Sequence, residues 1–102
     1  MIHVIATLHA APGRGADLLS EFQRIVPQVR AEVGCLEYGP TRDIDSGIEG
    51  LPAARADVLT IVEKWESVAA LKAHLSASHM LAYREAVKDI LAGADIRVLE
   101  PA

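Results

Sequence analysis

Residues 58–83 read VLTIVEKWESVAALKAHLSASHMLAY. Residues 58–65 give the clearest β-strand signal in the chain, because β-branched and aliphatic residues follow one another there. Ser67 occupies the N-cap position of a following helix, whose apolar residues recur at helical spacing. Residues 76–78, Ser-Ala-Ser, predict an interruption before a second helical piece, because closely spaced serines favour capping geometry. The stretch also holds the only Trp and two of the four His, a concentration that indicates a pocket.

The residues before this stretch predict two strands and one amphipathic helix. Residues 2–9 alternate, so that one strand face is fully apolar and the other is mixed. Residues 18–33 carry apolar side chains at helical spacing until Gly34 stops the pattern. Residues 35–43 look extended, but the Gly39-Pro40 pair suits an edge or bulged strand better than a central one.

A long connection and a short final strand complete the pattern. Residues 44–57 are too many for a tight hairpin, and a loop of this length could close the entrance of a pocket. The second helical piece is predicted to end at Gly93, and residues 96–99 form the closing strand. The order β-α-β-β-α-β predicts one domain, residues 1–102, of the α+β class. It is the ferredoxin-like split βαβ fold, with a four-stranded antiparallel sheet and both helices on one face.

The predicted fold leaves the other face of the sheet uncovered. The first and third strands carry apolar residues on both faces, so exposure to water would leave a large apolar patch. A face-to-face homodimer is the expected solution. No internal repeat is visible.

Composition narrows the function classes. The chain has 102 residues, a formal charge of -4 and no basic block, so nucleic acid is not expected as a partner. The first residues lack the features of a signal peptide, and no apolar run approaches the length of a membrane span. Cys35 is the only cysteine, which fits a reducing compartment, and we expect a cytoplasmic protein.

His79 and Tyr83 are the first candidates for chemistry. At positions i and i+4 they share one helical face and could both point between helix and sheet. A His accepts a proton near neutral pH, and a phenol beside it could orient it or bind a substrate oxygen. The alternative makes His79 a cap residue and Tyr83 a core residue. His74, at the edge of the buried stripe, is favoured as a structural residue.

Trp65 and Glu63 lie on the same face of the third strand. Trp65 is either a core anchor or a pocket wall for a flat ligand. A carboxylate pointing into a closed layer needs a partner, and Glu63 could find one in Arg84, Arg97 or the histidines. Tyr38, on the second strand, could enter the same cavity.

The spacing of the histidines argues against a metal site. His74 and His79 are five residues apart, which places them about 140° apart around an unbroken helix. We therefore expect no protein metal site.

The sequence resembles the antibiotic biosynthesis monooxygenase domain family, and within it the bacterial quinol monooxygenase branch. The matching segments are Glu63-Lys64-Trp65-Glu66-Ser67, Leu71, His74, His79-Met80, Tyr83, Ile25-Val26-Pro27, Glu32-Val33-Gly34-Cys35, Ala86-Val87-Lys88 and Ile96-Arg97-Val98-Leu99-Glu100-Pro101. The resemblance implies a homodimeric α+β barrel in which two sheets face each other. For several members it also implies oxidation of quinols or phenolic polyketides by dioxygen without a metal, haem or flavin.

Haem-degrading members of the family differ from this chain. They use an Asn on the first strand, a Trp on the helix and a His further along that helix. The matching positions here are Ala6, His74 and Arg84, which argues against haem degradation.

These inferences combine into a hypothesis of cofactor-independent monooxygenation of a quinol or similar phenol, with a small aromatic substrate and dioxygen as partners. His79 would accept the proton, and Tyr83 and Tyr38 would bind substrate oxygens. Glu63 would orient a donor or belong to an ion pair. His74 is the third catalytic candidate beside His79 and Tyr83. Trp65, Met80 and Leu71 would form the pocket walls, and Arg84 is the remaining candidate for substrate binding. A non-catalytic dimeric binder of small aromatics and an isomerase of a small phosphorylated signalling molecule are the alternatives.

Overall fold

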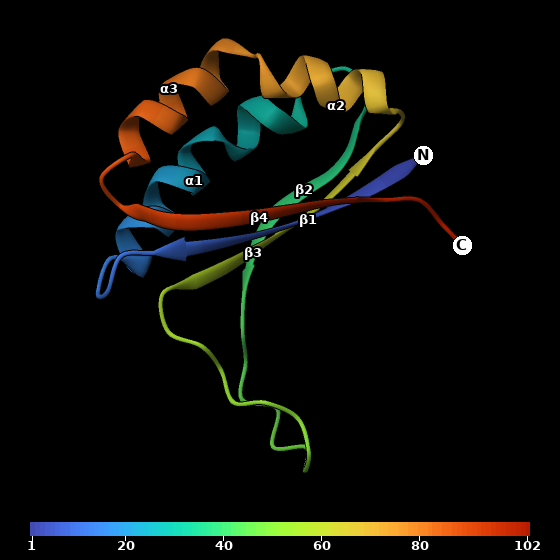
Figure 1. Ribbon diagram of the computed structural model, residues 1–102. Helices are drawn as coiled ribbons and strands as arrows, with labels where there is room; N and C mark the ends of the chain where they lie inside the picture. The colour runs from blue at the N-terminus through green and yellow to red at the C-terminus, as the bar shows by residue number, and fades with distance from the viewer.

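A computed structural model describes residues 1–102 and has seven elements of secondary structure. They are β1 (Ile2–Ala10), α1 (Gly15–Arg30), β2 (Cys35–Arg42), β3 (Val58–Trp65), α2 (Val68–Leu75), α3 (Ser78–Val87) and β4 (Leu91–Leu99). All paired strands are antiparallel, and the sheet order is β2-β3-β1-β4. All three helices cover one face of this sheet (Figure 1). The ferredoxin-like prediction is confirmed, with the second helical region split in two.

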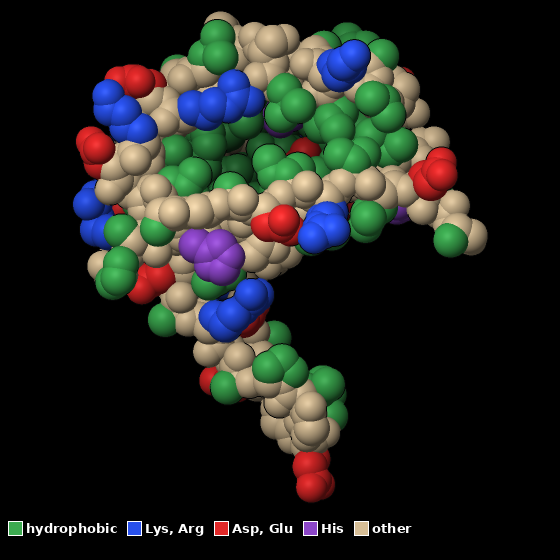
Figure 2. All heavy atoms as spheres, viewed as in Figure 1, with side chains coloured by type: hydrophobic (Ala, Val, Ile, Leu, Met, Phe, Trp, Pro, Cys, Tyr) green, Lys and Arg blue, Asp and Glu red, His purple; other side chains and the backbone are tan.

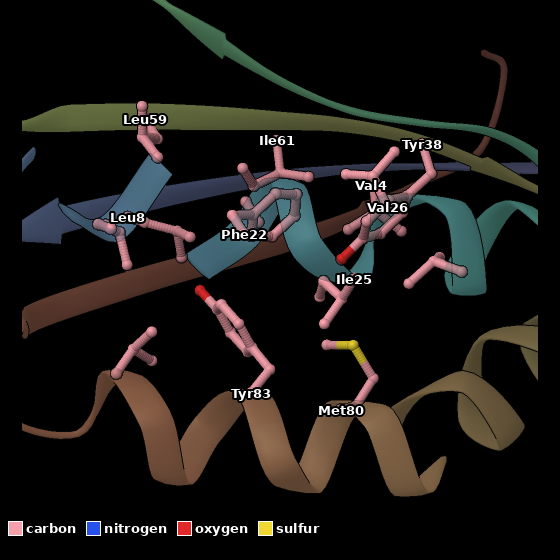
Figure 3. Close-up of a cluster of buried hydrophobic side chains, with 14 of the residues drawn as sticks. Val4, Leu8, Phe22, Ile25, Val26, Tyr38, Leu59, Ile61, Met80 and Tyr83 are labelled. Atoms are coloured by element: carbon pink, nitrogen blue, oxygen red, sulfur yellow. The ribbon is translucent and has the colours of Figure 1, made fainter. Parts of the chain in front are cut away.

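The core lies between this sheet face and the helices. The apolar face predicted for β1 is the one that packs, because Val4, Ala6 and Leu8 are buried. At its centre the ring of Phe22, from α1, stacks on Tyr38 at a centroid distance of 5.4 Å and meets Tyr83 edge-on at 5.5 Å. Figure 3 shows strands, α1 and α3 contributing side chains to this one cluster.

The predicted break inside residues 68–87 is confirmed. The Ser67 hydroxyl accepts a hydrogen bond from the Ala70 backbone N–H at 3.1 Å, which caps α2. The Ser76 hydroxyl donates to the carbonyl of Ala73 at 3.3 Å, and Ala77 is extended, with a ψ of 144°. The chain therefore changes direction between α2 and α3, which decides where their side chains point.

Both predicted helix ends extend too far along the chain. Helix α1 stops at Arg30, and Val33, expected on its buried face, is 91% exposed. Residues 31–34 instead form a turn, in which the Glu32 N–H donates to the Val29 carbonyl at 2.9 Å. Helix α3 ends at Val87 rather than near Gly93, because the chain from Leu91 onward pairs along β1. Tertiary strand pairing overrides the helical pattern there.

Residues 43–57 do not close a pocket. This connection projects away from the sheet on the side opposite the helices (Figure 1). Asp43 accepts two hydrogen bonds from the Arg55 guanidinium, at 2.8 and 3.2 Å, and Asp45 accepts one from the Ala54 N–H at 2.7 Å. The expectation that this loop guards the cavity entrance is wrong, because none of its residues lines the apolar cavity between the sheet and helices α2 and α3.

The chain has no helix that is both long enough and apolar enough to span a bilayer.

Gly34 fixes the turn after α1 against α2. Its φ is +86°, its carbonyl accepts a hydrogen bond from the Glu66 N–H at 2.8 Å, and a Cβ there would lie 2.6 Å from the Ala70 Cβ. Gly50 has the same φ of +86° but no atom within 4 Å of such a Cβ. A substitution at Gly50 therefore reports backbone strain alone, whereas one at Gly34 reports backbone strain together with a steric clash.

We predict that Gly34→Ala destabilises the protein more than Gly50→Ala. Both substitutions place a side chain in the left-handed region, at a cost of about 1–2 kcal/mol. Gly34→Ala adds overpacking against Ala70, which costs a further ~1–3 kcal/mol. Urea unfolding of the two variants measures this difference, and equal losses would contradict the role given to the contact with Ala70.

Candidate functional site

An apolar cavity of about 270 Å³ lies between the sheet and helices α2 and α3. Figure 2 shows a hollow lined by hydrophobic side chains between the helices and β4. Fourteen of the seventeen lining residues are hydrophobic, and the other three are Glu63, His74 and Arg84. A hollow of about 500 Å³ beside β2 is larger but more open and less apolar, so the apolar cavity is the better candidate.

Glu63 is a buried carboxylate at the wall of this cavity. It is 6% exposed, and Trp65, two residues further along the same strand face, donates its indole N–H to Glu63 Oε1 at 2.9 Å. Burial raises the pKa of Glu63 to about 7, the Trp65 hydrogen bond opposes this, and the charge of Glu32 adds to it. Near neutral pH the group can therefore either hold or accept a proton. Its partner is Trp65 rather than an arginine or a histidine.

His74 lines the cavity and is clamped between aromatic rings. Its side chain is 2% exposed, and its ring centroid lies 4.7 Å from that of Trp65 and 5.3 Å from that of Tyr38. Desolvation lowers the pKa of His74, although Glu32 opposes this effect. A lowered pKa keeps the ring neutral at neutral pH, and a neutral imidazole can accept a proton.

Glu32 joins His74 and His79. The Glu32 Oε2 atom lies 2.8 Å from His74 Nδ1 and 2.9 Å from His79 Nε2. The expectation that these two histidines cannot converge on one point is wrong, because it assumed an unbroken helix. Three potential ligand atoms lie within 4.8 Å of one another, and two His with one carboxylate are a set that Zn²⁺ takes. The distances to Oε2 are those of hydrogen bonds, which satisfy the cluster without an ion.

Two tyrosine hydroxyls face the interior. Tyr83 extends from α3 toward the sheet (Figure 3), and its buried hydroxyl has no hydrogen-bond partner. Burial raises the pKa of Tyr83 to about 12 and raises the pKa of Tyr38 further still, so both stay protonated. A buried donor without an acceptor costs about 1–3 kcal/mol, so the Tyr83 hydroxyl weakens the fold in the unliganded protein.

The structure brings together most of the side chains that the sequence singled out. Those that line the cavity are Tyr38, Glu63, Leu71, His74, Met80, Tyr83 and Arg84. Trp65 is fully buried behind Glu63 and His74, and His79 borders a surface hollow between α1 and α3. The Arg84 guanidinium donates to the Leu75 carbonyl at 2.7 Å. It is therefore committed to the end of α2 rather than to Glu63.

Glu32 is the residue of this site to which the sequence analysis gave no role. Helical spacing up to Val33 places this turn at the end of the buried helical stripe, whereas α1 ends at Arg30. The available signal was indirect: two histidines flank a predicted helix break, and a break lets them meet a common partner. Nothing in the local sequence of residues 31–34 identifies that partner.

The fold and the cavity define a small ferredoxin-like α+β protein with an apolar pocket and converging titratable groups. Residues 1–86 match the family model for antibiotic biosynthesis monooxygenase, and the chain belongs to this family. It is 40% identical to "Probable quinol monooxygenase YgiN" of Escherichia coli over 103 residues, which cover 99% of this chain and 98% of that protein.

Solved structures share the fold of this chain. The chain matches PA3566 from Pseudomonas aeruginosa with a TM-score of 0.82 and 29% identity, covering 99% of this chain and 93% of that one. It matches Rv0793 from Mycobacterium tuberculosis with a TM-score of 0.81 and 26% identity, covering 99% and 94%. The expected family is thus confirmed.

We predict that Glu63→Gln stabilises the protein increasingly as the pH rises. The folded wild-type protein holds the Glu63 proton more tightly than the unfolded chain does. The contribution of this proton to the stability of the wild type is therefore fully present below pH 4.5 and is lost as the pH rises through about 7. The loss amounts to about 3 kcal/mol at most. Gln keeps an oxygen for the Trp65 N–H but never becomes charged.

Chemical unfolding of both proteins at pH 5 and pH 8 tests this. The advantage of the variant should be small at pH 5 and largest at pH 8. The exposed pair Glu85 and Lys88 offers a matched control, since Glu85→Gln removes a carboxylate that is not buried. An advantage that does not grow with pH would contradict the assigned state of Glu63.

Proposed function

We propose that the protein oxidises a quinol, or a similar electron-rich phenol, with dioxygen and without a cofactor. The observation that carries this proposal is the apolar cavity lined by both His74, which a lowered pKa keeps neutral, and Tyr83. Family membership supports monooxygenase chemistry, and the name of the E. coli relative supports a quinol as substrate. A cavity of about 270 Å³ favours a compact one- or two-ring aromatic over a large cofactor.

The reaction balances without an external reductant. A quinol and O2 give a hydroxyquinone and water: one oxygen atom enters a ring C–H bond, and the other leaves as water. The quinol supplies all four electrons, two from its O–H groups and two from the C–H bond. The protein then needs only to bind the ring, move protons and exclude bulk water.

The first step is removal of a phenolic proton. The Nδ1 atom of His74 is occupied by Glu32, so Nε2 is the nitrogen free to accept it. The resulting anion gives an electron to dioxygen, and recombination of the two radicals forms the new C–O bond. Loss of water from the hydroperoxide needs a proton on the departing oxygen, which protonated Glu63 or His74 can return.

The tyrosines position the substrate. Tyr83 donates its hydroxyl hydrogen to a substrate oxygen, and Tyr38 offers a second donor at the sheet. Both have a raised pKa, so neither competes with the substrate as an acid. Met80 and Leu71 supply the apolar walls, and Trp65 holds His74 and Glu63 in place from behind.

The alternatives find less support. An isomerase for a phosphorylated substrate needs clustered positive charge, but the only basic residue at the cavity is Arg84, which already binds a carbonyl. A non-catalytic binder of aromatics would use the same cavity, and a turnover measurement separates it from an enzyme.

We also propose a homodimer through the uncovered sheet face. Ile5 and Val62 are paired neighbours on this face, and Val62 remains 39% exposed. Apolar residues on an otherwise open sheet favour burial against a second sheet. A cytoplasmic location stays a prediction based on the single cysteine.

We predict that metal-free protein consumes dioxygen when an anaerobically prepared naphthoquinol is added, one O2 per hydroxylated product. His74→Gln should lower kcat by about 10²–10⁴-fold, because it removes the proton acceptor. Glu85→Gln, a carboxylate-to-amide change at an exposed side chain on α3, should leave the rate unchanged. An oxygen electrode and product mass measure both, with the enzyme-free rate subtracted.

A second variant guards against misfolding as the cause of any loss. Tyr83→Phe removes an unsatisfied hydroxyl, so its stability should equal or exceed that of the wild type, while kcat/KM falls roughly tenfold. Hydrogen peroxide in place of the hydroxylated product would mean simple oxidation. Quinone binding without oxygen uptake would establish the non-catalytic alternative.

For the dimer, we predict that Val62→Lys gives a monomer by light scattering because it buries a charge in the interface. Leu81→Lys, at a side chain 55% exposed on α3, should leave the mass unchanged. A wild-type monomer, or a Val62→Lys dimer, would contradict this interface.

A further inference from the structure

The three members of the Glu32 cluster come from three parts of the fold. Glu32 lies in the turn after α1, His74 near the end of α2, and His79 in the first turn of α3. Their side chains are 15%, 2% and 19% exposed, respectively. A single carboxylate oxygen accepts from both rings, so the state of one ring affects the other.

Only one end of this cluster reaches the substrate cavity. His74 lines it, whereas Glu32 and His79 do not. His79 borders the separate surface hollow between α1 and α3. Any influence of Glu32 or His79 on the bound phenol must therefore pass through His74.

We propose that Glu32 and His79 are positioning residues for the proton step: Glu32 holds His74 with Nδ1 protonated and Nε2 facing the cavity, and His79 sets how much of the Glu32 charge His74 experiences. The kinetic consequence rests on the function proposed above. The protonation states do not, and they can be measured in inactive protein.

The first part follows from hydrogen-bond chemistry. An ionised carboxylate only accepts hydrogen bonds, so the nitrogen 2.8 Å away must carry the proton. A neutral imidazole then has its lone pair on the other nitrogen. The Glu32 charge also stabilises the imidazolium formed when His74 takes the phenolic proton.

The second part follows from the shared oxygen. A protonated His79 donates a charge-assisted hydrogen bond to Glu32 and neutralises much of its field. His74 then becomes a weaker base. A neutral His79 returns the Glu32 charge to His74, which becomes a stronger base.

Other charged groups also face the cluster. Arg84 from α3 opposes protonation of His74. Cys35 on β2 and Glu63 on β3 both interact with Glu32, and Arg30 lies near Cys35 at the end of α1. All of these remain in variants of Glu32 or His79, so opposite effects of the two substitutions report on the cluster itself.

The test is histidine nitrogen NMR of the full chain across a pH titration, with Glu32→Gln and His79→Gln as the variants. Gln at 79 can still donate to Glu32 but never carries a charge. The wild-type His74 should show a proton on Nδ1. The midpoint of the His74 titration should fall in Glu32→Gln and rise in His79→Gln.

Kinetics provide the second readout. Glu32→Gln should lower kcat roughly tenfold or more with little change in KM, because Glu32 does not touch the cavity. The acid limb of the kcat/KM profile should move to lower pH in Glu32→Gln and to higher pH in His79→Gln. A merely structural role would not move the limb in opposite directions.

The matched control is Glu85→Gln, which should leave the His74 midpoint in place. A wild-type His74 protonated on Nε2 would overturn the role of Glu32. An unmoved midpoint in His79→Gln would overturn the role of His79. If the protein binds Zn²⁺ stoichiometrically and the His74 titration then disappears, the cluster is a metal site and the proposal is overturned. If the wild-type protein takes up no oxygen but the NMR results are as expected, only the proposed function is refuted and the roles of Glu32 and His79 stand.

Discussion

The site depends on the hydrogen bonds received by one oxygen atom, Glu32 Oε2. Through this atom the turn after α1 is tied to both α2 and α3, whose mutual orientation is set by the break at residues 76–78. Gly34 reinforces the same junction two residues later, because its carbonyl receives the Glu66 N–H and its missing side chain admits Ala70. Without this junction, His74 would lose the hydrogen bond that orients its ring between Trp65 and Tyr38.

The cavity also concentrates features that weaken the fold. A buried carboxylate with a raised pKa and a tyrosine hydroxyl without a partner each reduce stability in the unliganded protein. The Trp65 indole offsets the first only in part. Such violations of polar satisfaction cluster where a protein binds or transforms a ligand, and here both border the same apolar space. The destabilised groups therefore support the location of the site independently of family membership.

The sequence predicted the fold well because its signals there are local or periodic. Alternation identified the packed face of β1, and serine chemistry identified the cap at Ser67 and the following break. The errors have a common cause, since helical spacing continued beyond the points where other contacts ended α1 and α3. Placing the site was harder for the same reason. The direction of His79 depends on a change of chain direction, and the role of Glu32 depends on two residues more than forty positions away.

The charges of the groups in and behind the cavity suit the proposed reaction. The proposed reaction creates an anion in an apolar space, where a second negative charge would oppose its formation. Two tyrosines that keep their protons and a neutral His74 add no charge, and Glu63 adds none while it is protonated. The Glu32 charge raises the pKa of His74, but this carboxylate lies behind His74 and outside the cavity. It can therefore stabilise the imidazolium that forms without repelling the substrate anion directly. Because Glu32 and the cavity are separated in this way, His74 can take the phenolic proton while the substrate anion stays away from the Glu32 charge.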